Sequence, residues 1–120
     1  MTYNRGDVIE IPFNIPGQGS KNHPAIIISN EDVYNIEGIY ICVMVTHSNI
    51  SDYFAFDLEP EMFLNPKNVP EGKAKAHLIA YIEQKHIITN TSSKKCKMLK
   101  IYVDRLVDFI ASRVLSEDDF

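Results

Sequence analysis

The stretch Ile-Tyr-Ile-Cys-Val-Met-Val-Thr, residues Ile39–Thr46, decides the fold class. All of its residues except the last are apolar, and most are β-branched or aromatic. A short apolar run of this composition favours a strand that is buried on both faces. Runs of similar character lie at residues 8–13, 25–29, 53–58 and 76–83. The chain is therefore predicted to contain about five or six short strands.

The apolar pattern changes near the C-terminus. From Leu99 to Val114, apolar residues recur at spacings of three and four, and charged residues fill the positions between them. This spacing predicts one amphipathic helix. Strands followed by a single helix predict a mainly β domain, a small antiparallel barrel covered by a C-terminal helix.

The segments between these runs are rich in turn-forming residues. Residues 14–22 contain Pro16, Gly17 and Gly19 and are predicted to form a flexible loop. Residues 30–38 are polar with weak helical character, and residues 59–72 are irregular with one helical turn. Residues 86–88 are expected to continue the preceding strand after a bend.

Length and composition are those of an ordinary globular protein. The 120 residues are 45% hydrophobic and 23% charged, so we expect one domain spanning residues 1–120. The net charge of −4 argues against a large nucleic-acid footprint and leaves room for a small basic site. No apolar run could span a bilayer, and the first residues lack signal-peptide features, so we expect a cytoplasmic protein without membrane contact.

Several short motifs, in order, resemble the MazF/PemK/Kid family of toxins. Arg5-Gly6-Asp7 resembles the family's opening, and His23-Pro24 followed by isoleucines resembles its Arg-Pro-apolar strand. The strand ending in Thr46 resembles the one that ends in the family's catalytic Thr, and Glu83-Gln84-Lys85-His86 resembles its Glu-Gln-x-Arg stretch. The resemblance covers nearly the whole chain and implies an SH3-like antiparallel barrel.

The resemblance also implies a function and a site. It implies the toxin of a type II toxin–antitoxin pair, an endoribonuclease that cuts single-stranded RNA without metal or other cofactor, with His23 and Thr46 as catalytic residues. The family has Arg where this chain has His23 and His86. His23 could exchange protons near neutral pH but lacks the forked phosphate contact of Arg. RNA contacts are expected from the following set: Lys21, His47, Ser48, Asn49 and His86.

Other interpretations remain open. Without the resemblance, His23 is an ordinary loop residue and Thr46 an ordinary strand residue. The four histidines show no metal-binding spacing, so no metal site is predicted. A degenerate SH3-like module that binds RNA or protein without cutting is the main alternative. A CcdB-like gyrase inhibitor is a weaker one, because the chain has no Trp. The toxin hypothesis predicts a homodimer and a cognate antitoxin as partners.

Overall fold

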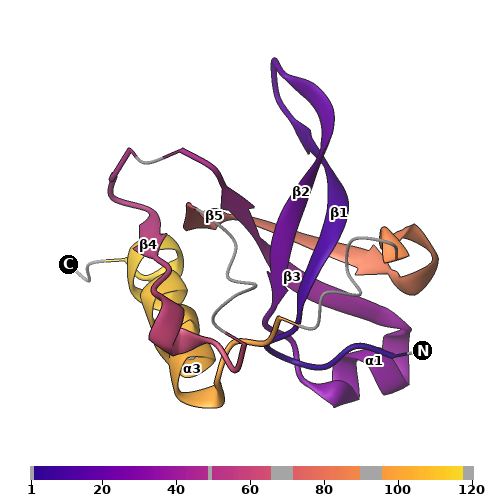
Figure 1. The fold of residues 1–120 in the computed structure, drawn as a ribbon. Coiled ribbons are helices and arrows are strands. Elements are labelled where there is room, and N and C mark those ends of the chain that lie inside the picture. The colour runs from indigo at the N-terminus through magenta and orange to yellow at the C-terminus, as the bar shows by residue number, and fades with distance from the viewer. Residues whose placement is uncertain (1, 49, 66–71, 90–95, 118–120) are drawn as a thin grey trace.

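The computed structural model describes residues 2–48, 50–65, 72–89 and 96–117. They form a single antiparallel sheet with the strand order β1-β2-β3-β5-β4, shown in Figure 1. The strands and helices of the described residues have these bounds: β1 Val8–Ile15, β2 Gly19–Ile27, α1 Glu31–Glu37, β3 Ile39–Thr46, β4 Ala55–Asp57, η1 Pro60–Met62, β5 Lys73–Glu83, η3 Gln84–His86, α3 Lys100–Ile110 and η4 Ala111–Leu115. The predicted fold class, a mainly β antiparallel barrel with a C-terminal helix, is confirmed.

The central strand β3 separates two apolar clusters, one on each face of the sheet. Val43 and Val45 contribute to the cluster beneath the terminal helix, which supplies Val103 and Leu106. The other face buries residues of β1, β2 and β3: Ile9, Ile11, Phe13, Ala25, Ile27, Cys42 and Met44. A strand buried on both faces needs a continuous apolar run, which is why β3 is so evident in the sequence.

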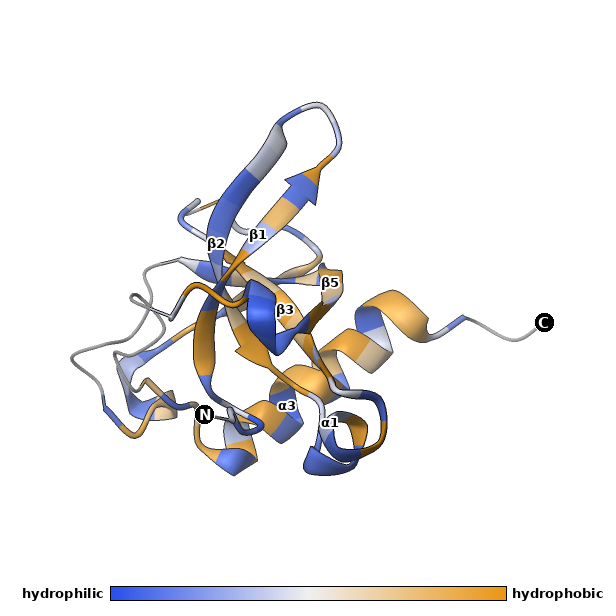
Figure 2. Ribbon diagram, turned by 90° about the vertical axis from the view of Figure 1, so that its right-hand side faces the viewer, coloured by the Kyte–Doolittle hydropathy of each residue, from blue (hydrophilic) through white to orange (hydrophobic). Residues whose placement is uncertain are grey.

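The terminal helix behaves as its spacing predicted. Val103, Leu106 and Ile110 are buried against the sheet, and Figure 2 shows the alternation of apolar and polar positions along α3. The last residues, Ala111–Leu115, continue the helix with π-type hydrogen bonding. No helix in the described segments is long and apolar enough to cross a membrane.

The prediction of a loop at residues 14–22 is wrong. β1 and β2 remain paired as far as Ile15 opposite Gly19, with Pro12 opposite Asn22, so only a tight turn separates them. Pro12 is tolerated because β1 is the edge strand of the sheet. The hairpin projects beyond the sheet (Figure 1), and its tip does not fold over the end of β3 as a flexible loop would.

One smaller expectation changes and another is confirmed. Residues 86–88 were expected to continue the fifth strand after a bend; instead His86 ends the 3-10 turn Gln84–His86, and Ile88 donates its backbone N–H to the Glu10 carbonyl of β1 at 2.9 Å. The segment with weak helical character is the short helix α1, which begins where the Asn30 side chain accepts a hydrogen bond from the Val33 N–H at 3.3 Å. It ends at Gly38, whose φ of 72° is the left-handed conformation common at helix C-termini.

The Arg5-Gly6-Asp7 motif holds the N-terminus against the terminal helix. Arg5 donates to the Ile28 carbonyl at 3.1 Å and pairs with Asp104 of α3 at 3.0 Å. At Gly6 a Cβ atom would lie 2.6 Å from the Met98 carbonyl oxygen, so only glycine fits. This motif therefore has a structural role in this chain.

Candidate functional site

The candidate site lies where the outer half of β2 passes the end of β3. These strands pair from Ile27 opposite Cys42 to Ala25 opposite Met44. His23 lies two residues beyond this pairing on β2, and Thr46 lies two residues beyond it on β3, where the register of β3 also shifts between Val43 and Val45. The Val45 carbonyl is close enough to the His23 ring to raise its pKa, so the two residues that the family resemblance makes catalytic lie in the same region of the sheet.

The His23 imidazole is partly buried, and both of its nitrogens are shielded from solvent. Neither Nδ1 nor Nε2 makes a hydrogen bond of ordinary geometry among the described residues, and the Val45 carbonyl lies near enough to raise the pKa of the ring. The Phe13 ring, from β1, lies edge-on to the imidazole with 6.3 Å between ring centroids. A shielded polar group that is poorly hydrogen-bonded costs stability, so the fold keeps this histidine at some expense.

The surroundings of His23 favour its neutral form. Burial lowers its pKa from the ordinary value of 6.5, and the nearby cationic groups His47 and Lys21 lower it further. The Glu10 carboxylate and the Val45 carbonyl act in the opposite direction. The neutral imidazole can accept a proton, which the Arg found at this position in the family cannot do.

Thr46 is the last residue of β3, and its backbone is tightly held. It pairs with Lys73 at the start of β5. A Cβ atom on Gly72 would lie 1.6 Å from the Thr46 carbonyl oxygen and 3.1 Å from the His47 Cα. The Thr46 hydroxyl accepts a hydrogen bond from the Ser48 N–H at 3.3 Å, so its oxygen faces the chain that follows. The sequence prediction missed Gly72, because nothing in its local sequence reveals this close approach.

The predicted RNA-contacting residues do not all gather here. Lys21 is exposed on β2, two residues before His23, and therefore on the same face of the strand. His47 and Ser48 are exposed just beyond Thr46. Asn49 lies outside the described residues. His86 lies on η3, beyond the end of β5 that pairs with the start of β3, roughly 20 Å from Thr46 along the strand.

A groove of about 330 Å³ adjoins the site on the Phe13 side. One wall is the outer part of β1 and the turn after it, and the other is β5 from His77 to Ala80. His77 is exposed, and its ring lies 4.6 Å from that of Phe54. The groove therefore offers an apolar surface with ring edges next to His23, which suits unpaired bases.

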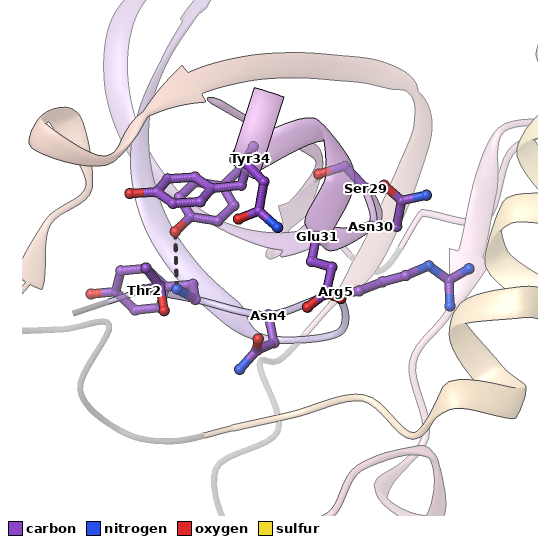
Figure 3. Close-up of a pocket in the computed structure, with 10 residues that line it drawn as sticks. Thr2, Asn4, Arg5, Ser29, Asn30, Glu31 and Tyr34 are labelled. Atoms are coloured by element: carbon purple, nitrogen blue, oxygen red, sulfur yellow. Dashed lines mark hydrogen bonds between the residues drawn. The ribbon is translucent and has the colours of Figure 1, made fainter. Parts of the chain in front are cut away.

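A second hollow lies at the other end of the sheet and holds none of the predicted site residues. It measures about 90 Å³ and is bordered by residues 2–5, the start of α1 and Tyr40. Figure 3 shows the Tyr40 hydroxyl accepting a hydrogen bond from the Tyr3 N–H, at 3.0 Å, and the Arg5 side chain extending toward the terminal helix. Its aromatic rings pack on one another, so we interpret it as part of the support for α1.

No group of three or more His, Cys, Asp or Glu side chains in the described part of the chain is arranged to hold a metal ion. Cys42 is free and fully buried, and burial raises its pKa to about 12.

The fold and the paired strand ends define a class: a small SH3-like barrel with a polar site beside a projecting hairpin. The sequence matches the family of PemK-like, MazF-like toxins of type II toxin–antitoxin systems over residues 4–107. The chain belongs to this family, as its motifs indicated. No curated protein matches the sequence.

Solved structures agree with the fold. A MazE–MazF complex from Deinococcus radiodurans (form III) superposes with a TM-score of 0.66 at 13% identity, covering 98% of this chain and 100% of that chain. MazF alone from the same organism (form I) gives 0.67 at 11% identity, with coverages of 97% and 99%. A mycobacterial endoribonuclease in complex with its cognate antitoxin gives 0.62 at 14% identity, with coverages of 98% and 100%.

Proposed function

We propose that this protein is a metal-independent endoribonuclease that cuts single-stranded RNA, acting as the toxin of its toxin–antitoxin pair. The observation that carries the proposal is the shielded, poorly hydrogen-bonded imidazole of His23 near the Thr46 end of β3. A catalytic role is one explanation for a group of this kind in a native fold. The solved endoribonuclease of the same fold supports the reaction class.

The reaction uses the RNA's own 2′-OH as nucleophile. The 2′-oxygen loses its proton and bonds to the adjacent phosphorus, the bond from phosphorus to the 5′-oxygen breaks, and that oxygen gains a proton. The products are a 2′,3′-cyclic phosphate and a 5′-OH end. His23, neutral in its surroundings, accepts the 2′-OH proton. The Thr46 hydroxyl donates a hydrogen bond to a phosphate oxygen, and Lys21 adds positive charge.

RNA must first reach the His23 imidazole, whose nitrogens are shielded from solvent in the free protein. A productive complex therefore requires the imidazole to turn toward the surface that carries Lys21 and His47. Hydrogen bonds of catalytic groups commonly form only in the complex with substrate. The same enclosure is the observation that favours the alternative, a module that binds RNA without cutting it.

The experiment is incubation of the purified protein with mixed-sequence RNA in the presence of EDTA, followed by analysis of the product ends. We expect cleavage with cyclic or 3′-phosphate ends, and a loss of about 10²-fold in rate for His23→Ala. His23→Arg restores the family's residue but cannot accept the 2′-OH proton as a neutral imidazole does, so retained or raised activity in this variant would show that the position acts through its charge. If EDTA abolishes cleavage and magnesium restores it, the mechanism is wrong. If wild type and His23→Arg both leave RNA intact, the non-catalytic alternative holds.

We further propose that the protein forms a homodimer, binds a cognate antitoxin and is cytoplasmic. The solved MazE–MazF complexes support the antitoxin. The apolar stripe of α3 is already used by the protein's own core, so it does not require a dimer. Other apolar side chains remain exposed on the outer face of β5 and on the terminal helix: Ile79, Tyr81, Ile101 and Leu115. Light scattering that gave a monomer mass at micromolar concentrations would contradict the dimer.

A further inference from the structure

The proposed cleavage needs two proton transfers at two different oxygens. In an in-line displacement, the attacking 2′-oxygen and the departing 5′-oxygen lie on opposite sides of the phosphorus. A group that removes the first proton is therefore badly placed to supply the second. His23 accounts for one transfer only, and a second proton donor must lie across the phosphate from it.

We propose that His47 is this donor, so that His23 and His47 act as a general base and a general acid on either side of the scissile phosphate. This assignment rests on the proposed ribonuclease function and extends it. It makes His47 a catalytic residue in place of a mere RNA contact.

The position of His47 supports the role. It follows Thr46 directly, three residues beyond the last pair of β2 and β3, Ala25 opposite Met44, and His23 lies two residues beyond the same pair on β2. Its Cα is 3.1 Å from where a Gly72 Cβ would be, so the start of β5 packs directly against the His47 backbone. Its side chain is exposed and close enough to influence the charge of His23. The backbone is thus fixed while the imidazole is free to meet substrate.

The other polar groups at the site are poorer donors. The Thr46 and Ser48 hydroxyls hold their protons too tightly to protonate a leaving oxygen efficiently. Lysine and carboxylate side chains as classes exchange protons far from neutral pH, which makes them poorer proton donors to a leaving oxygen there than an imidazole. An imidazole is the side chain whose ordinary proton exchange falls between about pH 5 and 8.

The test compares two leaving groups. The first substrate is an RNA oligonucleotide that contains the site cut by the wild type. The second is the same oligonucleotide with sulfur in place of the 5′-oxygen at that site. A thiol has an ordinary pKa of about 8.5, whereas an alkoxide is far more basic, so the sulfur departs without a proton donor.

We expect His47→Ala to slow cleavage of the oxygen substrate by about 10²-fold and cleavage of the sulfur substrate less than about threefold. His23→Ala should slow both substrates alike, because both need the 2′-OH deprotonated. Glu37→Ala is the control, since it removes an exposed side chain on α1 that belongs to neither the catalytic site nor the expected RNA contacts, and it should slow neither. In the pH–rate profile of the oxygen substrate, His47→Ala should lose the decline at alkaline pH.

Two results would overturn the assignment. If His47→Ala slows the cleavage of both substrates equally, His47 is a binding or structural residue. If His47→Ala cuts both substrates at the wild-type rate, His47 has no role in the reaction. Failure of the wild type to cut either substrate would instead refute the ribonuclease proposal itself. Because the His47 side chain is exposed, the variant should melt at the wild-type temperature, which a thermal scan verifies.

Discussion

Gly72 offers the sharpest test of how the site is built. It lies immediately before β5 with a φ of 114°, and a Cβ atom there would be 1.6 Å from the Thr46 carbonyl oxygen. Real Cβ contacts are essentially never under 3.0 Å, so Gly72→Ala must move the end of β3 or the start of β5 by at least 1.4 Å. Both Thr46 and His47 are attached to the peptide group that must move.

The magnitude of each effect follows from this displacement. A misplacement of about 1 Å in a catalytic group costs about 10²-fold in rate, so the kcat of Gly72→Ala should fall by about that factor. Backbone strain at a positive φ costs about 1–3 kcal/mol, and the clash adds to it, so the variant should lose about 2 kcal/mol or more of folding stability. In a domain of this size each kcal/mol corresponds to about 4 °C of Tm, which predicts a decrease of about 8 °C or more.

Gly38→Ala is the matched control for backbone strain. Gly38 also has a positive φ, 72°, but a Cβ atom there would meet nothing within 4 Å. Its substitution should cost about 1 kcal/mol, about 4 °C in Tm, and leave the cleavage rate unchanged. The assays are thermal unfolding and single-turnover RNA cleavage of both variants. Gly72→Ala with a wild-type rate and the Tm of Gly38→Ala would refute the reasoning.

Two further perturbations address stability. The pKa of His23 is lower in the folded protein than its ordinary 6.5, so the unfolded chain binds a proton first as the pH falls. Wild type should therefore lose folding stability as the pH decreases below 6.5, whereas His23→Leu should lose less and be more stable at every pH. Urea unfolding of both proteins at about pH 8 and about pH 5 measures the difference. An equal loss of stability in the two proteins between these pH values would contradict the prediction. Arg113 donates to the Tyr53 carbonyl at 2.8 Å and lies 4.5 Å from the centre of the Tyr53 ring. Arg113→Ala should cost about 1 kcal/mol in thermal unfolding, and an unchanged Tm would show that this contact contributes nothing.

The sequence was most informative where burial imposes a pattern. Ile39–Thr46 was predicted to the residue, because a strand covered on both faces can contain little except apolar residues. The terminal helix was predicted within a residue or so at each end, because only one of its faces is buried. In both cases the local pattern and the tertiary environment require the same residues.

The hairpin shows where this reasoning fails. Its outer half, from Asn14 to Asn22, is almost wholly exposed, so no alternation of apolar and polar residues marks it as a strand. Its pairing is set by the inner half, where Ile9 and Ile11 of β1 face the buried part of β2. Pro16, Gly17 and Gly19 indicated a loop, but Pro16 and Gly17 lie in the tight turn and Gly19 begins β2. The extended conformation of these residues depends on the pairing of β1 with β2, which the local amino-acid composition does not reveal.

The candidate site contains both kinds of residue, those that the sequence could indicate and those that it could not. His23 and Thr46 could be paired from the sequence only through the family motifs, since neither residue type is unusual where it stands. The pairing of β2 with β3, which ends two residues short of both, then places them in one region for a reason that is independent of the family. Gly72 and the groove beside Phe13 have no comparable signal, because each depends on contacts between segments distant in sequence.

The replacement of Arg by His at position 23 links the stability and the chemistry of the site. An always-charged guanidinium in this enclosure would need an anion beside it, whereas a neutral imidazole can remain buried at a smaller cost. The cost that remains, two shielded nitrogens that are poorly hydrogen-bonded, is recovered when a substrate supplies better hydrogen bonds. Binding of RNA should therefore stabilise this region more than its contact area suggests. A base at this position also leaves the second proton transfer to another group, the role that we propose for His47.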